Sequence, residues 1–130
     1  PLAEICRRED FSLIQLVTPT TPRDRALRIV ASSTGFLYYV SVTGITGERK
    51  ELPSDVIDNV AQLRRETDLP VCIGFGISRP EHVAMLAPVA DGLIVGSAMV
   101  RRVAEANSPQ AAAKSVAAFV QELRQAIDNA

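Results

Sequence analysis

The segment ADGLIVGSAMV, residues 90–100, places a short apolar run directly before a glycine and a small hydroxyl residue. The run predicts a buried strand over 91–96, and the residues behind it predict a short helix over 97–105. The segment PVCIGFGIS, residues 70–78, repeats this pattern, with a predicted strand over 70–75 that also ends near glycines. Two such junctions indicate a chain built from repeated strand–helix units.

The rest of the chain continues this alternation, and residues 2–10 at its start are typical of the end of a helix. The strands are continuous apolar runs, which is typical of strands covered on both faces. The order βαβαβαβα predicts an α/β fold with a parallel sheet flanked by helices. The remaining strands are expected over 11–19 and 35–42, and the remaining helices over 22–32, 54–66, from about 80, and from 109 onward.

Polar residues mark the expected starts of four helices. Thr21, Ser54 and Ser108 are expected to cap helices, and a proline follows Thr21 and Ser108. The run Ser78-Arg79-Pro80-Glu81 has the S-x-x-E form of a capping box. The residues expected on the buried face of the last helix are Val116, Phe119, Val120, Leu123 and Ile127.

The composition is that of one domain with a packed core. The chain has 130 residues, of which 47% are hydrophobic and 22% charged, and its formal net charge is -1. These values exclude a disordered chain and give no reason to expect nucleic acid or an anionic membrane as a partner. No apolar run reaches the roughly 20 residues of a membrane span, and no signal-peptide pattern is visible, so a cytoplasmic protein is expected.

Few residues of the kinds that carry metal or nucleophilic chemistry occur. Cys6 and Cys72 form no CxxC motif; Cys72, inside an apolar run, is expected to be a reduced core residue, with a disulfide as the alternative. His82 is the only histidine. It is expected at the surface of a helix because it has no clustered partner, and no residues show metal-ligand spacing. The pairs Arg64-Arg65 and Arg101-Arg102 are expected to lie on solvated helix faces, with a position of Arg101 or Arg102 near the start of the helix over 97–105 as the alternative.

Glycines stand at the carboxyl ends of three consecutive predicted strands: TGITG at 43–47, GFGIS at 74–78 and GSA at 96–98. In parallel α/β folds, ligands bind beyond these ends. Glycine lets the backbone approach a ligand, and the start of a helix presents free N–H groups that suit a phosphate. A tight turn is the alternative for any single glycine, but three such ends and a short extra helix favour a phosphate cradle. Its residues are Gly76, Gly96 and Ser97.

Three segments carry a resemblance to a known family: YYVSVTGITGERKELP at 38–53, LPVCIGFGISRPEHV at 69–83 and ADGLIVGSAMV at 90–100. Together they resemble the α subunits of tryptophan synthase, over nearly the whole chain. The resemblance implies a (βα)8 TIM barrel and a lyase of tryptophan biosynthesis that cleaves indole-3-glycerol phosphate to indole and glyceraldehyde 3-phosphate. It also implies no cofactor in the α subunit, since the indole passes to a β subunit that holds pyridoxal phosphate.

The resemblance also implies roles for individual residues. The loop at 43–53 would be a lid that closes over substrate, and its Thr46 would touch a catalytic aspartate of a neighbouring loop. Tyr38 would point into the barrel beside the substrate, as an accessory residue at most. The residues implied to hold the substrate phosphate, largely through backbone N–H groups, are Gly47, Gly76, Gly96 and Ser97. Those implied to line the substrate are Tyr38, Thr46, Gly74 and Phe75, the last two on the indole side.

The family carries its acid–base glutamate and aspartate in a region that no segment of this chain matches, so neither is expected here. A (βα)8 barrel needs about 250 residues, whereas this chain has 130. The four predicted strands therefore correspond to barrel strands five to eight. Residues 1–130 are expected to form one unit, a half-barrel that is inactive alone or nearly so. Open strand edges at 12–18 and 91–95 predict dimerisation, aggregation or binding of the missing half.

Other functions fit parts of the sequence. A non-catalytic phosphate-binding half-barrel, working as a binding or assembly module, needs the same glycines and stays open as an alternative. A flavodoxin-like receiver would need a phosphorylatable aspartate at a strand end, and no strand end offers one. The motif VTGITG argues against a related barrel enzyme of the same pathway.

Overall fold

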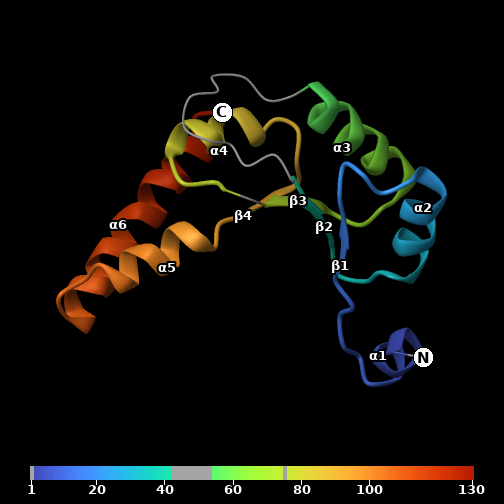
Figure 1. Cartoon of the computed structure of the whole chain (residues 1–130), viewed down its shortest axis with the longest axis horizontal. Helices are drawn as coiled ribbons and strands as arrows, with labels where there is room; N and C mark the ends of the chain where they lie inside the picture. The colour runs from blue at the N-terminus through green and yellow to red at the C-terminus, as the bar shows by residue number, and fades with distance from the viewer. Residues whose placement is uncertain (1, 42–53, 75) are drawn as a thin grey trace.

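The computed structural model describes residues 2–41, 54–74 and 76–130, and strands and helices alternate along these ranges as predicted (Figure 1). Each strand lies inside its predicted range and is shorter than predicted. The strands are β1 (Gln15–Val17), β2 (Leu37–Val40), β3 (Val71–Gly74) and β4 (Gly92–Ile94). The helices are α1 (Leu2–Arg8), α2 (Arg23–Ser32), α3 (Ser54–Glu66), α4 (Pro80–Leu86), α5 (Ser97–Ala104) and α6 (Pro109–Asp128).

The strands form one parallel sheet in the order β1-β2-β3-β4. The register aligns Tyr38 with Cys72, and Cys72 with Gly92. Neighbours in sequence are therefore neighbours in the sheet, which is the repeating arrangement of βα barrels. In Figure 1, α2 and α3 lie to one side of the strands, and α4, α5 and α6 lie to the other. The arrangement confirms an α/β fold with four parallel strands, as expected for half of a barrel.

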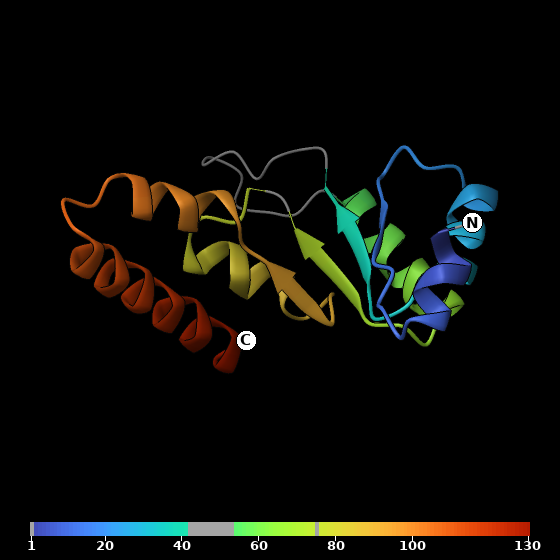
Figure 2. The same cartoon turned by 90° about the horizontal axis from the view of Figure 1, so that it is seen from below.

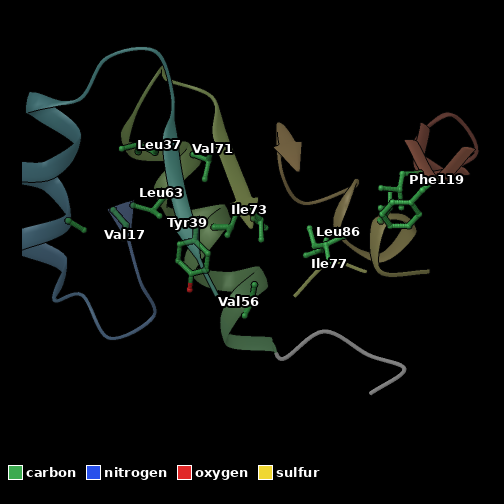
Figure 3. Close-up of a cluster of buried hydrophobic side chains, with 14 residues drawn as sticks. Val17, Leu37, Tyr39, Val56, Leu63, Val71, Ile73, Ile77, Leu86 and Phe119 are labelled. Carbon is green, nitrogen blue, oxygen red and sulfur yellow. The ribbon is translucent and has the colours of Figure 1, made fainter. Parts of the chain in front are cut away.

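One face of the sheet packs against helices and forms the core. Leu37, Tyr39, Val71 and Ile73 alternate along β2 and β3 toward this face, and none is more than 1% exposed. This burial of apolar area is the main term that stabilises the sheet. The residues of α3 that cover it are Val56, Val60 and Leu63 (Figure 3).

The other face of the sheet is not covered by helices within the described residues, so the prediction that both faces are covered is wrong for this chain. Leu16 on this face is 55% exposed. Tyr38 and Cys72 are half-buried there. The reason is topological: four parallel strands do not close on themselves, so the face that a closed barrel encloses stays open.

The buried face of α6 is narrower than predicted. Phe119 and Leu123 are buried, and Val116 is half-buried. Val120 is 46% and Ile127 is 40% exposed, so their predicted burial is wrong. The reason is visible in Figure 2, where α6 lies antiparallel to α5 and the pair extends away from β4. Only the stripe of α6 that meets α4 and α5 can be covered there.

One predicted helix cap is replaced by another contact, and one is confirmed. α2 begins at Arg23 with Pro22 as its N-cap. The hydroxyl of Thr21 instead accepts the backbone N–H of Thr18 at 3.0 Å, which closes the turn after β1. The predicted cap of α6 is confirmed, since the Ser108 hydroxyl accepts the N–H of Ala111 at 3.1 Å.

The carboxylate of Asp91 connects β3, β4 and α3. Its Oδ2 accepts the backbone N–H of the buried Val71 at 2.9 Å, and its Oδ1 accepts from the Arg64 guanidinium at 2.9 Å. We expect Asp91→Ala to lower the free energy of unfolding by about 1–2 kcal/mol, because a buried N–H loses its acceptor. Urea unfolding measures this change.

A matched control is Asp128→Ala, which removes an exposed i,i+4 ion pair with Arg124. Such pairs contribute about 0.5 kcal/mol or less. Equal losses in the two variants would show that the Asp91–Val71 hydrogen bond contributes nothing beyond a surface ion pair.

Candidate functional site

A pocket with a volume of about 220 Å³ lies at the carboxyl ends of β2, β3 and β4. It brings together four residues predicted for the site: Tyr38, Gly76, Gly96 and Ser97. The predicted residues Thr46, Gly47 and Phe75, and the predicted lid at 43–53, lie outside the described residues. The other residues that line the pocket are Ile77, Ser78, Ile94, Ala98 and Arg101.

The first wall of the pocket is the start of α5. Gly96 is the N-cap of this helix, and its carbonyl accepts the N–H groups of Met99 and Val100 at 2.9 and 3.1 Å. No side chain caps the helix. The first amides of a helix, here those of Ser97 and Ala98, have no acceptor within the helix and carry the positive end of its dipole. This wall therefore suits an anion.

Gly96 has room in front of it. A Cβ built on Gly96 would meet no atom of the described residues within 4 Å, so their packing does not require glycine at this position. Glycine there leaves the approach to the helix start free for a ligand.

The second wall is the loop that follows β3. Gly76 has a φ of 69°, in the left-handed region that residues with a Cβ rarely adopt. Ile77 is buried and anchors this loop to the core, while Ser78 is exposed at the pocket. The backbone conformation of this loop therefore favours glycine at position 76.

Tyr38 forms the floor of the site on the open face of the sheet, and Gly74 lies beneath its ring. A Cβ on Gly74 would lie 2.6 Å from Cε2 and 2.6 Å from the hydroxyl oxygen of Tyr38, and 2.9 Å from the Cβ of Ile94. The Tyr38 ring thus lies directly over Gly74. Gly74 does not line the pocket itself; it makes the space that the ring occupies.

Arg101 lines the pocket and is exposed, so the expected solvated position and the alternative position near the helix start both hold for it. It stands four residues after Ser97, and this spacing puts both on one side of α5. Its side chain lines the pocket. Arg102, in contrast, stacks on the ring of Phe119 at 3.7 Å from the centroid. The spacing of four residues from Ser97 is the sequence signal that distinguishes Arg101 from Arg102.

His82 is buried, so its predicted surface position is wrong. It is 1% exposed, on the same side of α4 as Val83 and Leu86. Its Nδ1 accepts the backbone N–H of Ser78 at 3.4 Å. The predicted capping box fails at the same point, because Arg79 is the N-cap of α4 and no side chain caps the helix.

Within the described ranges, the cysteines and the carboxylates form no further candidate site. Cys6 and Cys72 are both free thiols, which confirms the reduced state and excludes the disulfide alternative in this structure. Burial raises the pKa of Cys72, and the charge of Asp91 raises it further, so the thiol stays protonated. Among the residues that the structure describes, no group of three His, Cys, Asp or Glu side chains could hold a metal ion.

A second pocket, of about 160 Å³, lies between α2 and α3 on the helix side of the sheet. The Tyr39 hydroxyl accepts a hydrogen bond from Asn59 there, at 3.3 Å. Burial raises the pKa of Tyr39, so its hydroxyl stays neutral. Arg23 and Glu66 close the rim through an ion pair of 2.7 Å. No strand-end glycine is among the described residues that line this pocket. The Arg23 side chain at the start of α2 is paired there with the Glu66 carboxylate. The first pocket is therefore the candidate site.

None of the helices within the described ranges is long and apolar enough to cross a membrane.

Comparisons with known proteins agree on one family. The family model described as tryptophan synthase alpha chain matches residues 1–128. The tryptophan synthase alpha chain of Rhodopirellula baltica is 60% identical, over 99% of this chain and 50% of the relative. That of Chloroflexus aurantiacus is 42% identical, over 97% of this chain and 47% of the relative.

Solved structures give the same result. Tryptophan synthase subunit alpha from Legionella pneumophila str. Paris superposes with a TM-score of 0.80 at 31% identity, over 99% of this chain and 47% of that one. A chain of the tryptophan synthase α2β2 complex of Pyrococcus furiosus gives 0.82 at 36% identity, over 95% and 49%. The chain spans about half the length of the curated relatives it matches. The fold, the pocket at its strand ends and these matches together show that the chain belongs to the tryptophan synthase alpha chain family.

Proposed function

We propose that residues 1–130 form one unit, the phosphate-binding half of a tryptophan synthase α chain that cleaves indole-3-glycerol phosphate to indole and glyceraldehyde 3-phosphate. The observation that carries the proposal is the uncapped start of α5 at the pocket, opposite Gly76. The amides of Ser97 and Ala98 would donate to the phosphate oxygens, and the helix dipole favours the negative charge. Gly47 would add a further amide, as the resemblance implies.

The rest of the pocket suits the remainder of this substrate. Tyr38 presents an aromatic ring beside the phosphate wall, over Gly74. The indole side would lie against this floor and, as the resemblance implies, against Phe75, with Thr46 in the lid above. No carboxylate is among the described residues that line the pocket. We propose that the acid–base groups come from the other half of a barrel, as the resemblance implies, and we expect this chain alone to be inactive or nearly so.

The proposed partners follow from the open sheet. Leu16, on the edge strand β1, is 55% exposed. Parallel edge strands with exposed apolar side chains favour pairing with another chain. We propose that β1 and β4 pair with the missing half of the barrel, or with a second copy when that half is absent. The relative from P. furiosus is part of an α2β2 complex, and we propose the same β partner, with pyridoxal phosphate held there and no cofactor in the α chain.

The experiment that tests the proposal is an amide NMR titration with glycerol 3-phosphate. We expect shifts concentrated at Gly76, Gly96 and Ser97, and none of that size with glycerol. Equal responses to the two compounds would remove the phosphate site from the proposal.

A non-catalytic binding module remains the second candidate, because no carboxylate lines the described pocket. Mixing the chain with the amino-terminal half of a relative separates the two functions. Recovery of indole formation supports the enzyme half. Assembly of the two halves without indole formation supports the module.

Arg101 gives a prediction that depends on this proposal. We expect Arg101→Ala to weaken glycerol 3-phosphate binding by about fivefold, close to 1 kcal/mol, because an exposed cation facing the anion is removed. Calorimetric titration measures the affinity.

The matched control is Arg102→Ala on the next residue. Its guanidinium stacks on Phe119, so we expect a loss of stability with unchanged affinity. Equal affinities in the two variants would show that Arg101 does not face the phosphate.

A further inference from the structure

His82 lies directly behind the second wall of the pocket. It is 1% exposed, and its Nδ1 accepts the Ser78 amide at 3.4 Å. The backbone of Gly76 also forms a hydrogen bond with the ring, which raises the pKa of His82. Gly76 and Ser78 both line the pocket on their other side. One buried side chain thus contacts both ends of the loop segment that would face the phosphate.

The hydrogen bond sets the protonation state that this contact needs. A ring nitrogen that accepts a hydrogen bond carries no proton, so neutral His82 must hold its proton on Nε2. Within the part of the chain that the structure describes, Nε2 is buried without a hydrogen-bond partner. Protonation at Nδ1 would turn an acceptor into a donor that faces the Ser78 N–H, and this contact would be lost.

We propose that neutral His82 is a positioning residue that holds the Gly76–Ser78 wall in place, so that its protonation releases the wall and weakens anion binding. The inference rests on the proposed phosphate site and adds pH control to it. His82 touches no substrate in this scheme; it acts through the loop.

The surroundings favour the neutral ring. Burial lowers the pKa of His82, and Arg79 lowers it further, while Glu81 and the Gly76 backbone raise it. On α5, Arg101 lines the pocket and Arg102 stacks on Phe119. The charged residues of α6, which packs against α4, are all exposed: Lys114, Glu122, Arg124 and Asp128.

The sign of the effect on stability follows from this direction. The folded-state pKa of His82 lies below the unfolded value of about 6.5. Its contribution to stability is therefore fully present above the unfolded pKa and is lost as the pH falls through that value toward the folded one. Anion binding that depends on the neutral ring should be lost at lower pH still, as the folded protein itself takes up the proton.

Two variants separate the hydrogen bond from the charge. His82→Asn places an amide oxygen near the position of Nδ1, so it can accept the Ser78 N–H but does not titrate. His82→Leu fills similar space without an acceptor. Inorganic sulfate is the probe, because it stays a dianion throughout this pH range and any pH dependence then belongs to the protein.

Sulfate affinity is measured by calorimetry in steps from about pH 7.5 down to about pH 4, so that the series passes below the ordinary histidine pKa into the range where the folded protein takes up the proton. On acidification, we expect the affinity for sulfate to fall about tenfold more in wild type than in His82→Asn. His82→Leu should bind weakly throughout the series. A merely structural role for His82 would change the unfolding free energy of the variants and leave the pH dependence of binding equal in wild type and His82→Asn.

Two binding results would overturn the inference: the same pH dependence in wild type and His82→Asn, or tighter wild-type binding in acid, which would make His82 a cation for the anion. The amide shift of Ser78 is followed over the same pH range without any ligand. If neither wild type nor the variants bind sulfate, the proposed phosphate site fails, and the proposed effect of His82 on anion binding fails with it. A Ser78 shift that titrates in wild type but not in His82→Asn would then still establish the loop contact, and its absence would overturn that as well.

Discussion

Replacing Gly74 with alanine is expected to lower the free energy of unfolding by about 3 kcal/mol, the upper end of the usual range for overpacking. The added Cβ would lie 2.6 Å from two atoms of the Tyr38 ring and 2.9 Å from the Cβ of Ile94. The Tyr38 ring is the far end of a side chain and can rotate away. The Cβ of Ile94 is fixed to the backbone of β4, so the alanine can be accommodated only if β3 and β4 separate.

The background in which Gly74→Ala is made tests this account. In Tyr38→Ala the clash with the ring is gone, but the contact with Ile94 remains, so most of the loss should persist. Gly92→Ala is the matched comparison: its Cβ would lie 2.8 Å from the Cys72 sulfur and 3.8 Å from the Cys72 Cβ. In a Cys72→Ala background the penalty of Gly92→Ala should disappear. If Tyr38→Ala removed the whole loss of unfolding free energy caused by Gly74→Ala, the role given to Ile94 would be wrong.

The strand order and the pocket could be predicted because their signals are local. An apolar run ended by glycine and followed by a helical pattern identifies a βα unit without any knowledge of distant contacts. In a parallel sheet the carboxyl ends of the strands share one edge. Gly76, Gly96 and Ser97 therefore had to meet if the strands were right, and all three line one pocket.

The errors concern residues whose surroundings come from elsewhere in the chain. His82 was placed at the surface because it has no clustered partner, yet α6 packs against α4 and the His82 side chain is 1% exposed. Val120 and Ile127 fit a helical stripe, but the stripe is buried only where α4 and α5 reach it. Periodicity shows which residues can share a face, and the neighbouring helices decide how wide the covered part is.

Gly96→Val is expected to abolish most phosphate binding while leaving stability nearly unchanged. The valine side chain would fill the space in front of the helix start, and the donors of Ser97 and Ala98 could no longer reach an anion. We expect an affinity loss of about a hundredfold, or about 2.8 kcal/mol. A Cβ on Gly96 meets no atom within 4 Å in the part of the chain that the structure describes, and the φ of Gly96 is -113°. The change in unfolding free energy should therefore stay below about 1 kcal/mol.

The control is a change at another helix start, Ser108→Val, which removes the cap of α6. We expect it to lower the unfolding free energy by about 1 kcal/mol and to leave the affinity for glycerol 3-phosphate unchanged. Gly96→Val should therefore change binding with little change in stability, and Ser108→Val should change stability with no change in binding. If Gly96→Val binds glycerol 3-phosphate as the wild type does, the anion does not sit at the start of α5, and the open space before Gly96 serves another purpose. If it binds weakly but also unfolds early, Gly96 is needed for the fold, and its conformation at the N-cap, not its missing side chain, is what the site requires.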